Sequence, residues 1–213
     1  MAASFAPFRL PAPRPGRTQT ERKNRKGNIV KRLSLAPALF ALAVLPASAS
    51  GPQDAAVDFV RQSVSDMLNS PELIAAVRAQ NERHAGLSEA DIIALDDRWR
   101  AGDAEVIDAA LGNDLSRLLA EIVEKHGGAF SEIFVMDNRG LNVGQSARTS
   151  DYWQGDEAKW QQTYLVGPDA AHVSDVEEDE STQTFQVQVS LPVVDGGAPI
   201  GAITLGVDVE YLE

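Results

Sequence analysis

The strongest constraint on the fold is a regular alternation of apolar and polar residues near the C-terminus. Between positions 184 and 194 every second residue is apolar, and the segment Asp-Gly-Gly at 195–197 separates this run from a second alternating run over 198–209. Such alternation turns one face of a strand toward a core, and a Gly-rich turn between two such runs predicts an antiparallel hairpin. We therefore expect part of the hydrophobic core to lie against the apolar face of a sheet whose other face is polar.

Three more strands are predicted before this hairpin. The apolar run at 133–136 and the segment 141–145 are joined by the turn Asp-Asn-Arg-Gly at 137–140. A third strand at 172–176 is followed by an acidic stretch, 177–180, which we expect to form a turn. Five strands joined by short connections predict an antiparallel sheet.

Helices fill the chain before the sheet. Apolar residues recur at helical spacing from Pro52 to His84, with a break at Ser70-Pro71, where serine suits the N-cap and proline the first helical position. Further helices are predicted after Ser88, at 104–111, after Asn113, and at 156–164. The predicted fold class is α+β, with long N-terminal helices packed on a five-stranded antiparallel sheet.

Residues 1–49 have the layout of a secretory signal peptide. Six basic residues between positions 22 and 32 precede the apolar run Leu33–Leu45, and the small residues Ala47 and Ala49 follow it. The apolar run is shorter than the roughly 20 residues that a membrane span needs. We therefore expect cleavage near Ala49, a single mature domain at 50–213, and a periplasmic or secreted location.

Charge and composition exclude several classes of function. Residues 1–49 hold 9 of the 19 Lys and Arg and 1 of the 31 acidic residues, so 50–213 has 10 basic and 30 acidic residues and a net charge of −20. Such a domain repels nucleic acid and anionic lipid surfaces. The absence of cysteine excludes disulfides and thiolate chemistry, and His84, His126 and His172 lack metal-ligand spacing. We expect no metal and no cofactor.

The segment 149–160 contains the densest group of side chains suited to binding. Tyr152, Trp153 and Trp160 accompany three carboxylates and Lys159. Aromatic rings supply apolar walls and cation–π faces, and a loop held by a sheet is a frequent place for a ligand. The alternative is that the tryptophans close the core as a lid and bind nothing.

Three stretches of sequence, in this order, resemble a known family. They are FVMDNRGLNVGQS, TSDYWQGDEAKW and SDVEEDESTQTFQVQVSLPVVDGGAPIGAITLGVDVE. They are similar to the extracytoplasmic PAS-like sensor domains called Cache or PDC domains, of the single-module type, and the resemblance covers residues 57–210. It implies a long N-terminal helix, through which two copies pair in a homodimer, and a curved sheet. It also implies a small ligand between this sheet and the segment linking its second and third strands.

The resemblance also implies, by position, which residues contact that ligand. These are Asp151, Tyr152, Trp153, Asp156, Trp160, Asp175, Gln186 and Gln188. Tyr152 and Trp153 are expected as walls, and the aspartates as hydrogen-bond or charge partners. The family's amino-acid-binding pattern pairs an arginine with tyrosine and tryptophan here, whereas Asp151 stands beside Tyr152 in this chain. The sequence therefore leaves open whether the ligand is neutral, zwitterionic or cationic.

Three hypotheses of function follow. The first is an exported, non-enzymatic small-molecule sensor that lacks its own transmembrane or output module and acts with a membrane-bound signalling protein. The second is an interaction or structural protein of the same fold with a ligand-free pocket. The third is a hydrolase or metal-dependent enzyme that uses the carboxylates around 151–157.

Overall fold

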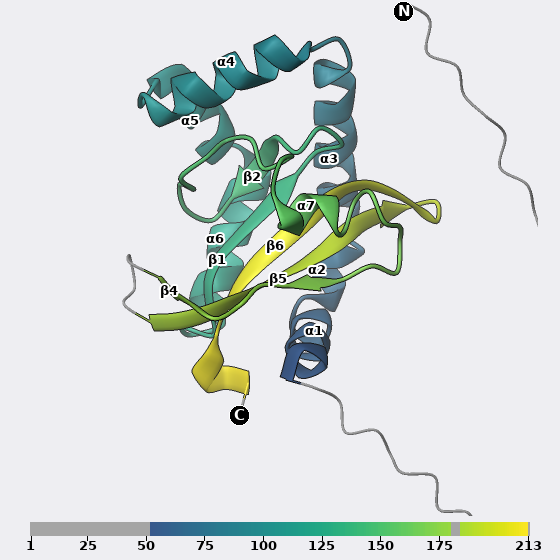
Figure 1. Cartoon of the computed structure of the whole chain (residues 1–213), viewed down its shortest axis with the longest axis vertical. Coiled ribbons are helices and arrows are strands. Elements are labelled where there is room, and N and C mark those ends of the chain that lie inside the picture. The colour runs from purple at the N-terminus through teal and green to yellow at the C-terminus, as the bar shows by residue number, and fades with distance from the viewer. Residues whose placement is uncertain (1–51, 180–183, 213) are drawn as a thin grey trace, which may run out of the picture. The chain divides into compact units, whose positions relative to one another are not determined.

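An antiparallel sheet forms the centre of the fold in the computed structural model, which describes residues 52–179 and 184–212 (Figure 1). Its strands in the described residues are β1 (Phe130–Met136), β2 (Asn142–Gln145), β3 (His172–Val173), β4 (Glu177–Asp179), β5 (Thr184–Asp195) and β6 (Ala198–Asp208). The spatial order is β2-β1-β6-β5-β3, and β4 pairs with the start of β5. The β5–β6 hairpin is the one that the alternation predicted.

The helices lie mostly before the sheet in sequence, as predicted. They are α1 (Pro52–Ser63), α2 (Ser65–Leu68), α3 (Pro71–His84), α4 (Glu89–Arg100), α5 (Ala104–Leu111), α6 (Asp114–Lys125) and α7 (Ala158–Gln161), with a 3-10 turn η1 (Val209–Leu212). The caps of the longer helices are local: the side chains of Ser70, Ser88 and Asn113 each accept a backbone N–H three residues ahead. The α+β class is confirmed.

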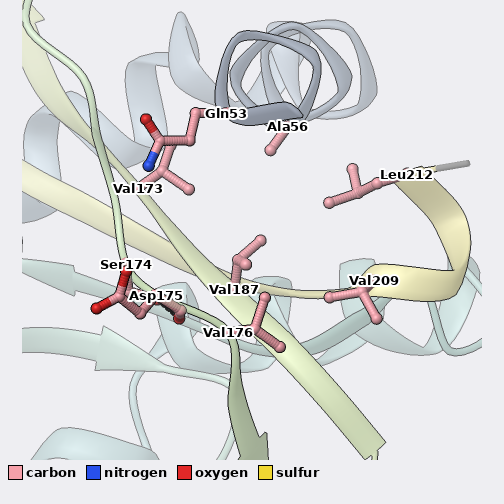
Figure 2. Close-up of a pocket in the computed structure, with 9 residues that line it drawn as sticks. All are labelled: Gln53, Ala56, Val173, Ser174, Asp175, Val176, Val187, Val209 and Leu212. Carbon is pink, nitrogen blue, oxygen red and sulfur yellow. Dashed lines mark hydrogen bonds between the residues drawn. The ribbon is translucent and has the colours of Figure 1, made fainter. Parts of the chain in front are cut away.

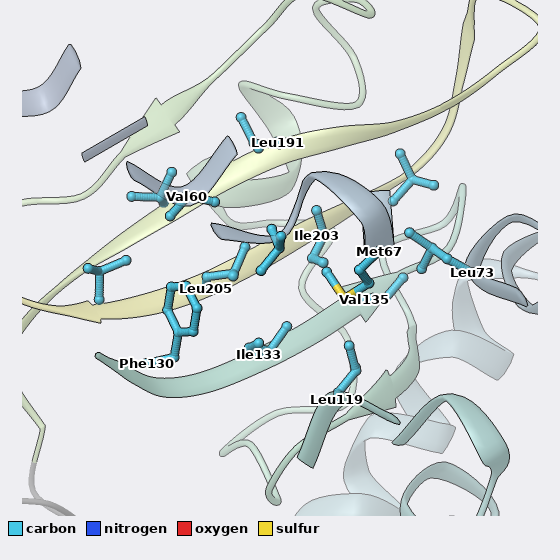
Figure 3. Close-up of a cluster of buried hydrophobic side chains, with 14 of the residues drawn as sticks. Val60, Met67, Leu73, Leu119, Phe130, Ile133, Val135, Leu191, Ile203 and Leu205 are labelled. Atoms are coloured by element: carbon cyan, nitrogen blue, oxygen red, sulfur yellow. The ribbon is translucent and has the colours of Figure 1, made fainter. Parts of the chain in front are cut away.

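The main hydrophobic core lies between one face of the sheet and helices α1, α2, α3 and α6 (Figure 3). Alternate residues of β1, β5 and β6 point to it, and residues from the four helices meet them. Among its members are Val60, Met67, Leu73, Leu119, Phe130, Ile133, Val135, Leu191, Ile203 and Leu205. Burying each such side chain contributes about 1.5–3 kcal/mol. This burial fixes the sheet against the helices.

The opposite face of the sheet is covered by residues 146–171, which link β2 to β3 and include α7. We refer to these residues as the cover segment. Phe134, Met136 and Ala202 are buried on this face, and Trp160 and Tyr164 pack against them. Figure 1 shows α7 on one side of the sheet and α3 on the other. The candidate ligand-binding segment therefore lies on the face that the helical core leaves free.

Some local predictions are wrong. The acidic residues 177–179 form strand β4 instead of a turn, because β5 extends past β3 and its first residues are free to pair with them. Glu180, the last residue of the predicted turn, lies outside the described residues. The third strand ends at Val173 instead of 176, and the helix expected at 156–164 is limited to Ala158–Gln161.

Two further observations concern export. The predicted signal peptide, 1–49, lies outside the described residues. Within 52–179 and 184–212, none of the helices has the length and apolarity that crossing a membrane requires.

Candidate functional site

The turn between β1 and β2 is the anchor of the candidate site. The buried Asp137 carboxylate accepts hydrogen bonds from the backbone N–H of Arg139 (2.8 Å) and of Leu141 (3.0 Å) and so closes the turn. Gly140 has φ +81°, and a Cβ at this position would lie 2.5 Å from Gly155 Cα. Only glycine therefore allows the cover segment to approach the turn this closely.

Both tryptophans of the cover segment are fixed to this turn by their ring nitrogens. Trp153 Nε1 donates to the carbonyl of Arg139 (2.9 Å), and Trp160 Nε1 donates to the carbonyl of Asp137 (3.0 Å). The backbone N–H of Gln154 donates to the carbonyl of Gly140 (2.7 Å). Because the indole N–H groups are used in this way, the surface that the two rings leave for the neighbouring space is apolar.

These two rings line a surface cavity of about 270 Å³, which we call the indole cavity. Its other lining residues are Glu89, Ile92, Asn138, Arg139 and Gly155. Glu89 begins α4 and is exposed, whereas Arg139 is partly buried. Neither side chain has an ion-pair partner among the described residues. The cavity therefore offers one negative charge, one positive charge and two indole faces.

An ion-pair network centred on the buried Asp96 holds the start of the cover segment. Asp96 of α4 is 4% exposed and accepts the backbone N–H groups of Tyr152 (2.8 Å) and Trp153 (3.1 Å). Arg100 pairs with Asp96 and also, at 2.7 Å, with Asp151. The attraction of Asp96 raises the pKa of Arg100, so the guanidinium stays charged. The Asp151 carboxylate thus has a partner within the chain.

Tyr152 packs in the same hydrophobic cluster as Trp153. Its ring stacks on Trp99 with centroids 5.5 Å apart, and the residue lines a different cavity, between α3, α5 and α6. Burial, helped by the nearby Asp137 carboxylate, raises the pKa of Tyr152 to about 12. The phenol is therefore a neutral hydrogen-bond donor at physiological pH.

The two predicted glutamines are engaged in bonds across the sheet. Gln186 accepts from the hydroxyl of Ser131, and Gln188 Nε2 donates to Glu132 Oε1 (2.8 Å). These pairs join β5 to β1 across Gly206 of β6, since Glu132 and Gln188 both sit opposite this glycine in the register. Their amides support the sheet at this point.

Asp175 lines a third cavity, of about 530 Å³, near the start of α1 (Figure 2). The lining is mostly apolar: Ala56, Val173, Val176, Val187, Val209 and Leu212 surround the polar residues Gln53, Ser174 and Asp175. Asp175 is exposed, and so is Asp156 in the cover segment.

The structure therefore brings together some of the eight predicted residues and separates others. Trp153 and Trp160 share the indole cavity, whereas Tyr152 and Asp175 line two other cavities. Asp151, Gln186 and Gln188 have partners within the chain. The contact of these residues with a ligand stays a prediction.

The two charged residues of the indole cavity were not singled out from the sequence. Arg139 belongs to the Asp-x-x-Gly turn, and Glu89 lies about 60 residues before the cover segment, so neither shares the aromatic cluster's signal. Lys159 pairs with Glu157 (2.8 Å) and lies 5.5 Å from the centre of the Phe134 ring. Within 52–179 and 184–212, no group of three or more metal-ligating side chains comes together.

Comparison with known proteins finds solved structures that are similar to this chain. None of the family models or curated proteins compared with the chain matches it. The ligand-binding domain of the Campylobacter jejuni chemoreceptor Tlp3, solved with 4-methylisoleucine, is 14% identical with a TM-score of 0.36, and the match covers 76% of this chain and 58% of that one. The V. cholerae histidine kinase DctB sensor domain is 14% identical with a TM-score of 0.35, covering 76% and 59%. The Pseudomonas aeruginosa amino acid chemoreceptor PctC, in complex with GABA, is 17% identical with a TM-score of 0.37, covering 54% and 55%.

All three are ligand-binding or sensor domains. They come from chemoreceptors and a histidine kinase. The matches span less than two thirds of each of these domains. With identities of 14–17% and TM-scores of 0.35–0.37, the likeness does not locate a site or a ligand in this chain.

Proposed function

We propose that this chain is an exported, Cache-type sensory domain that binds a small zwitterionic molecule in the indole cavity. The observation that carries the proposal is the composition of this cavity, where two anchored indole rings lie beside one unpaired cation and one unpaired anion. A zwitterion complements this set, since each of its charges finds an opposite charge and its apolar part finds ring faces.

Each lining residue has a definite role in this proposal. Arg139 pairs with the carboxylate of the ligand, and Glu89 pairs with its ammonium group. Trp153 and Trp160 form the walls, and Ile92 contacts the aliphatic part. The volume of about 270 Å³ suits a molecule of the size of an amino acid.

The proposal extends to how such a domain works. The mature domain spans 50–213 after cleavage near Ala49, in the periplasm or outside the cell, and has no enzymatic activity of its own. It passes the ligand signal to a membrane-bound signalling protein, with two copies pairing through α1. A ligand shifts such a system only by its different affinity for two arrangements of the domain.

A thermal-shift screen of the purified protein tests the proposal. The compounds are zwitterionic amino acids, short carboxylates, polyamines, purines and divalent cations. A ligand at 100 times its Kd stabilises the fold by about 2.7 kcal/mol, and we expect a zwitterionic amino acid to do so through the indole cavity. The variants Arg139→Gln and Glu89→Gln should each weaken binding about tenfold or more, whereas Arg61→Gln, on α1, should not.

A silent screen on a well-folded protein favours the second hypothesis, an interaction or structural protein of the same fold. One observation already points that way: Asp151, Gln186 and Gln188 have hydrogen-bond or ion-pair partners within the chain. Turnover of an ester, amide or phosphate substrate by the purified protein would favour the enzyme hypothesis instead.

A further inference from the structure

A second polar cavity lies on the helical side of β2, and we call it the helix cavity. Its volume is about 360 Å³. It lies between α3, the end of α5 and the first turn of α6, with Val143 and Tyr152 completing the wall. Room for it comes from small side chains: Ala76, Ala79, Ala109 and Ala110. It shares no lining residue with the indole cavity.

Two buried side chains in its wall have polar atoms that the described residues leave without a partner. Gln80 is 4% exposed, and its Nε2 donates to Asp137 Oδ2 (3.1 Å) and to the carbonyl of Asn142 (3.0 Å), while its Oε1 accepts no bond there. Tyr152 is 8% exposed, and its hydroxyl has no hydrogen-bond partner in this part of the chain. Neither atom is among the fully enclosed polar atoms that lack a partner, so both are open to solvent and can bond to a ligand in the cavity that their residues line.

Arg83 brings a positive charge to the same space. It lies three residues after Gln80 on the same face of α3 and has no ion-pair partner within 52–179 and 184–212. Arg83 is exposed and lines the same cavity as Tyr152. The domain has a net charge of −20 and as a whole repels anions. An arginine without an ion-pair partner is a place where an anion is attracted locally.

The remaining polar groups limit what this anion can be. His84 is held through Nδ1 by Asp137 at 2.9 Å, so Nε2 is its remaining polar atom. Asp114 stands at the rim, paired with Arg117. With one free arginine, a carboxylate at the rim and the acceptor Oε1 of Gln80, the cavity suits a single negative charge together with a hydrogen-bond donor, and disfavours a phosphate dianion.

We propose that the helix cavity is a second ligand site, independent of the one proposed above, for a small 2-hydroxycarboxylate. Arg83 pairs with the carboxylate, and the Tyr152 hydroxyl donates to it. The ligand's own hydroxyl donates to Gln80 Oε1. The positive end of the α6 dipole, whose first turn lines the cavity, adds to the attraction.

Calorimetric titration of the purified protein with lactate, acetate and lactamide tests this site. Lactate carries both the charge and the hydroxyl, acetate lacks the hydroxyl, and lactamide lacks the charge. We expect lactate to bind more tightly than acetate, and lactamide to show no binding. Arg83→Gln should weaken lactate binding about tenfold or more, and Tyr152→Phe, which keeps the ring, should weaken it several-fold.

Two control variants separate this site from the rest of the molecule. Arg78→Gln, on the same helix, alters an arginine that pairs with Asp195 away from the cavity, and should bind lactate as the parent does. Arg139→Gln alters the indole cavity and should also leave lactate binding unchanged. Lactate affinity that survives Arg83→Gln, that falls with Arg139→Gln instead, or that is absent at millimolar concentration in the folded parent overturns the proposal.

Discussion

The Tyr152 phenol makes stability depend on pH in the alkaline range. Its pKa is about 12 in the folded protein, chiefly because burial disfavours the charged form, whereas the unfolded chain ionises near the ordinary value of 10.0. The folded state therefore holds this proton more tightly. The associated stability is fully present below pH 10 and is lost as the pH rises toward 12, by about 3 kcal/mol in all.

Urea unfolding at a series of alkaline pH values measures this loss. The Tyr152→Phe variant cannot ionise and should lose less stability than the parent between pH 10 and 12. Tyr211→Phe, which removes an exposed phenol, is the matched control and should follow the parent. A Tyr152→Phe variant with the parent's pH dependence contradicts the assignment.

Gly140 is the residue on which the approach of the cover segment depends. Alanine there meets two obstacles, the positive φ of +81° and a Cβ that would lie 2.5 Å from Gly155 Cα. Gly102 has the same φ of +81° with no atom within 4 Å of its Cβ position, so Gly102→Ala bears only the backbone cost of about 1–2 kcal/mol. Gly140→Ala should be more destabilising by a further 1–3 kcal/mol or so. Equal unfolding free energies for the two variants would show that the contact with Gly155 is not tight.

The neighbouring residues Tyr152 and Trp153 show which feature of the site could not be predicted from the sequence. Tyr152 and Trp153 were predicted as walls of one pocket, but Tyr152 lies at a bend and lines the helix cavity, whereas Trp153, which forms a β-bridge with Leu141, lines the indole cavity. The aromatic composition was visible in the sequence, whereas the cavity that each ring lines depends on the path of the backbone at this bend. The same holds for Arg139 and Glu89, which only the fold brings to Trp153.

At the scale of elements, signals confined to a few residues predicted the structure well. The caps at Ser70 and Ser88, and the β5–β6 turn, each depend on residues close in sequence. The strand Glu177–Asp179 was missed because its pairing depends on how far β5 extends beyond β3. Its three acidic residues carry the composition of a turn, and a pairing partner on a neighbouring strand overrides that preference.

The capping box of α4 gives a prediction at this scale. Ser88 Oγ accepts the backbone N–H of Asp91 (3.2 Å), and the Asp91 carboxylate accepts the backbone N–H of Ser88 (2.9 Å). Because α4 carries Asp96, which holds the cover segment, this cap supports the site as well as the helix. Ser88→Ala should lower the free energy of unfolding by about 1 kcal/mol, measured by urea denaturation.

The Ser88→Ala prediction is checked by a control variant and by a second measurement. Ser65→Ala, in the first turn of α2, removes a serine hydroxyl that makes no cap bond and should change stability by less than about 0.5 kcal/mol. Hydrogen bonds from Ser88 lower the pKa of Asp91, so an NMR titration should find this pKa higher in Ser88→Ala. An unchanged Asp91 pKa would mean that the box is not formed in solution.

At the scale of the whole molecule, the two faces of the sheet are covered by different kinds of structure. The helices α1, α2, α3 and α6 complete the main core on one face, while the other face is closed by the shorter cover segment around α7. The two proposed sites lie where the cover segment and the helices meet the β1–β2 hairpin. Asp137 is bonded to both sides, through Gln80 and His84 on α3 and through the ring nitrogen of Trp160. This turn therefore connects the surroundings of the two cavities.

The net charge of −20 on residues 50–213 acts on the molecule as a whole. Like charges repel each other more in the compact state than in the unfolded chain, and salt screens this repulsion, with a Debye length of about 30 Å at 0.01 M and 8 Å at 0.15 M. We therefore expect the Tm to rise as sodium chloride is added from low to physiological ionic strength. The double variant Glu177→Gln, Glu178→Gln, which removes two exposed charges, should raise the Tm at low salt and reduce its salt dependence. A Tm that falls with salt, or a double variant with the parent's salt dependence, would show that ion pairs such as Arg100 with Asp96 outweigh the net repulsion.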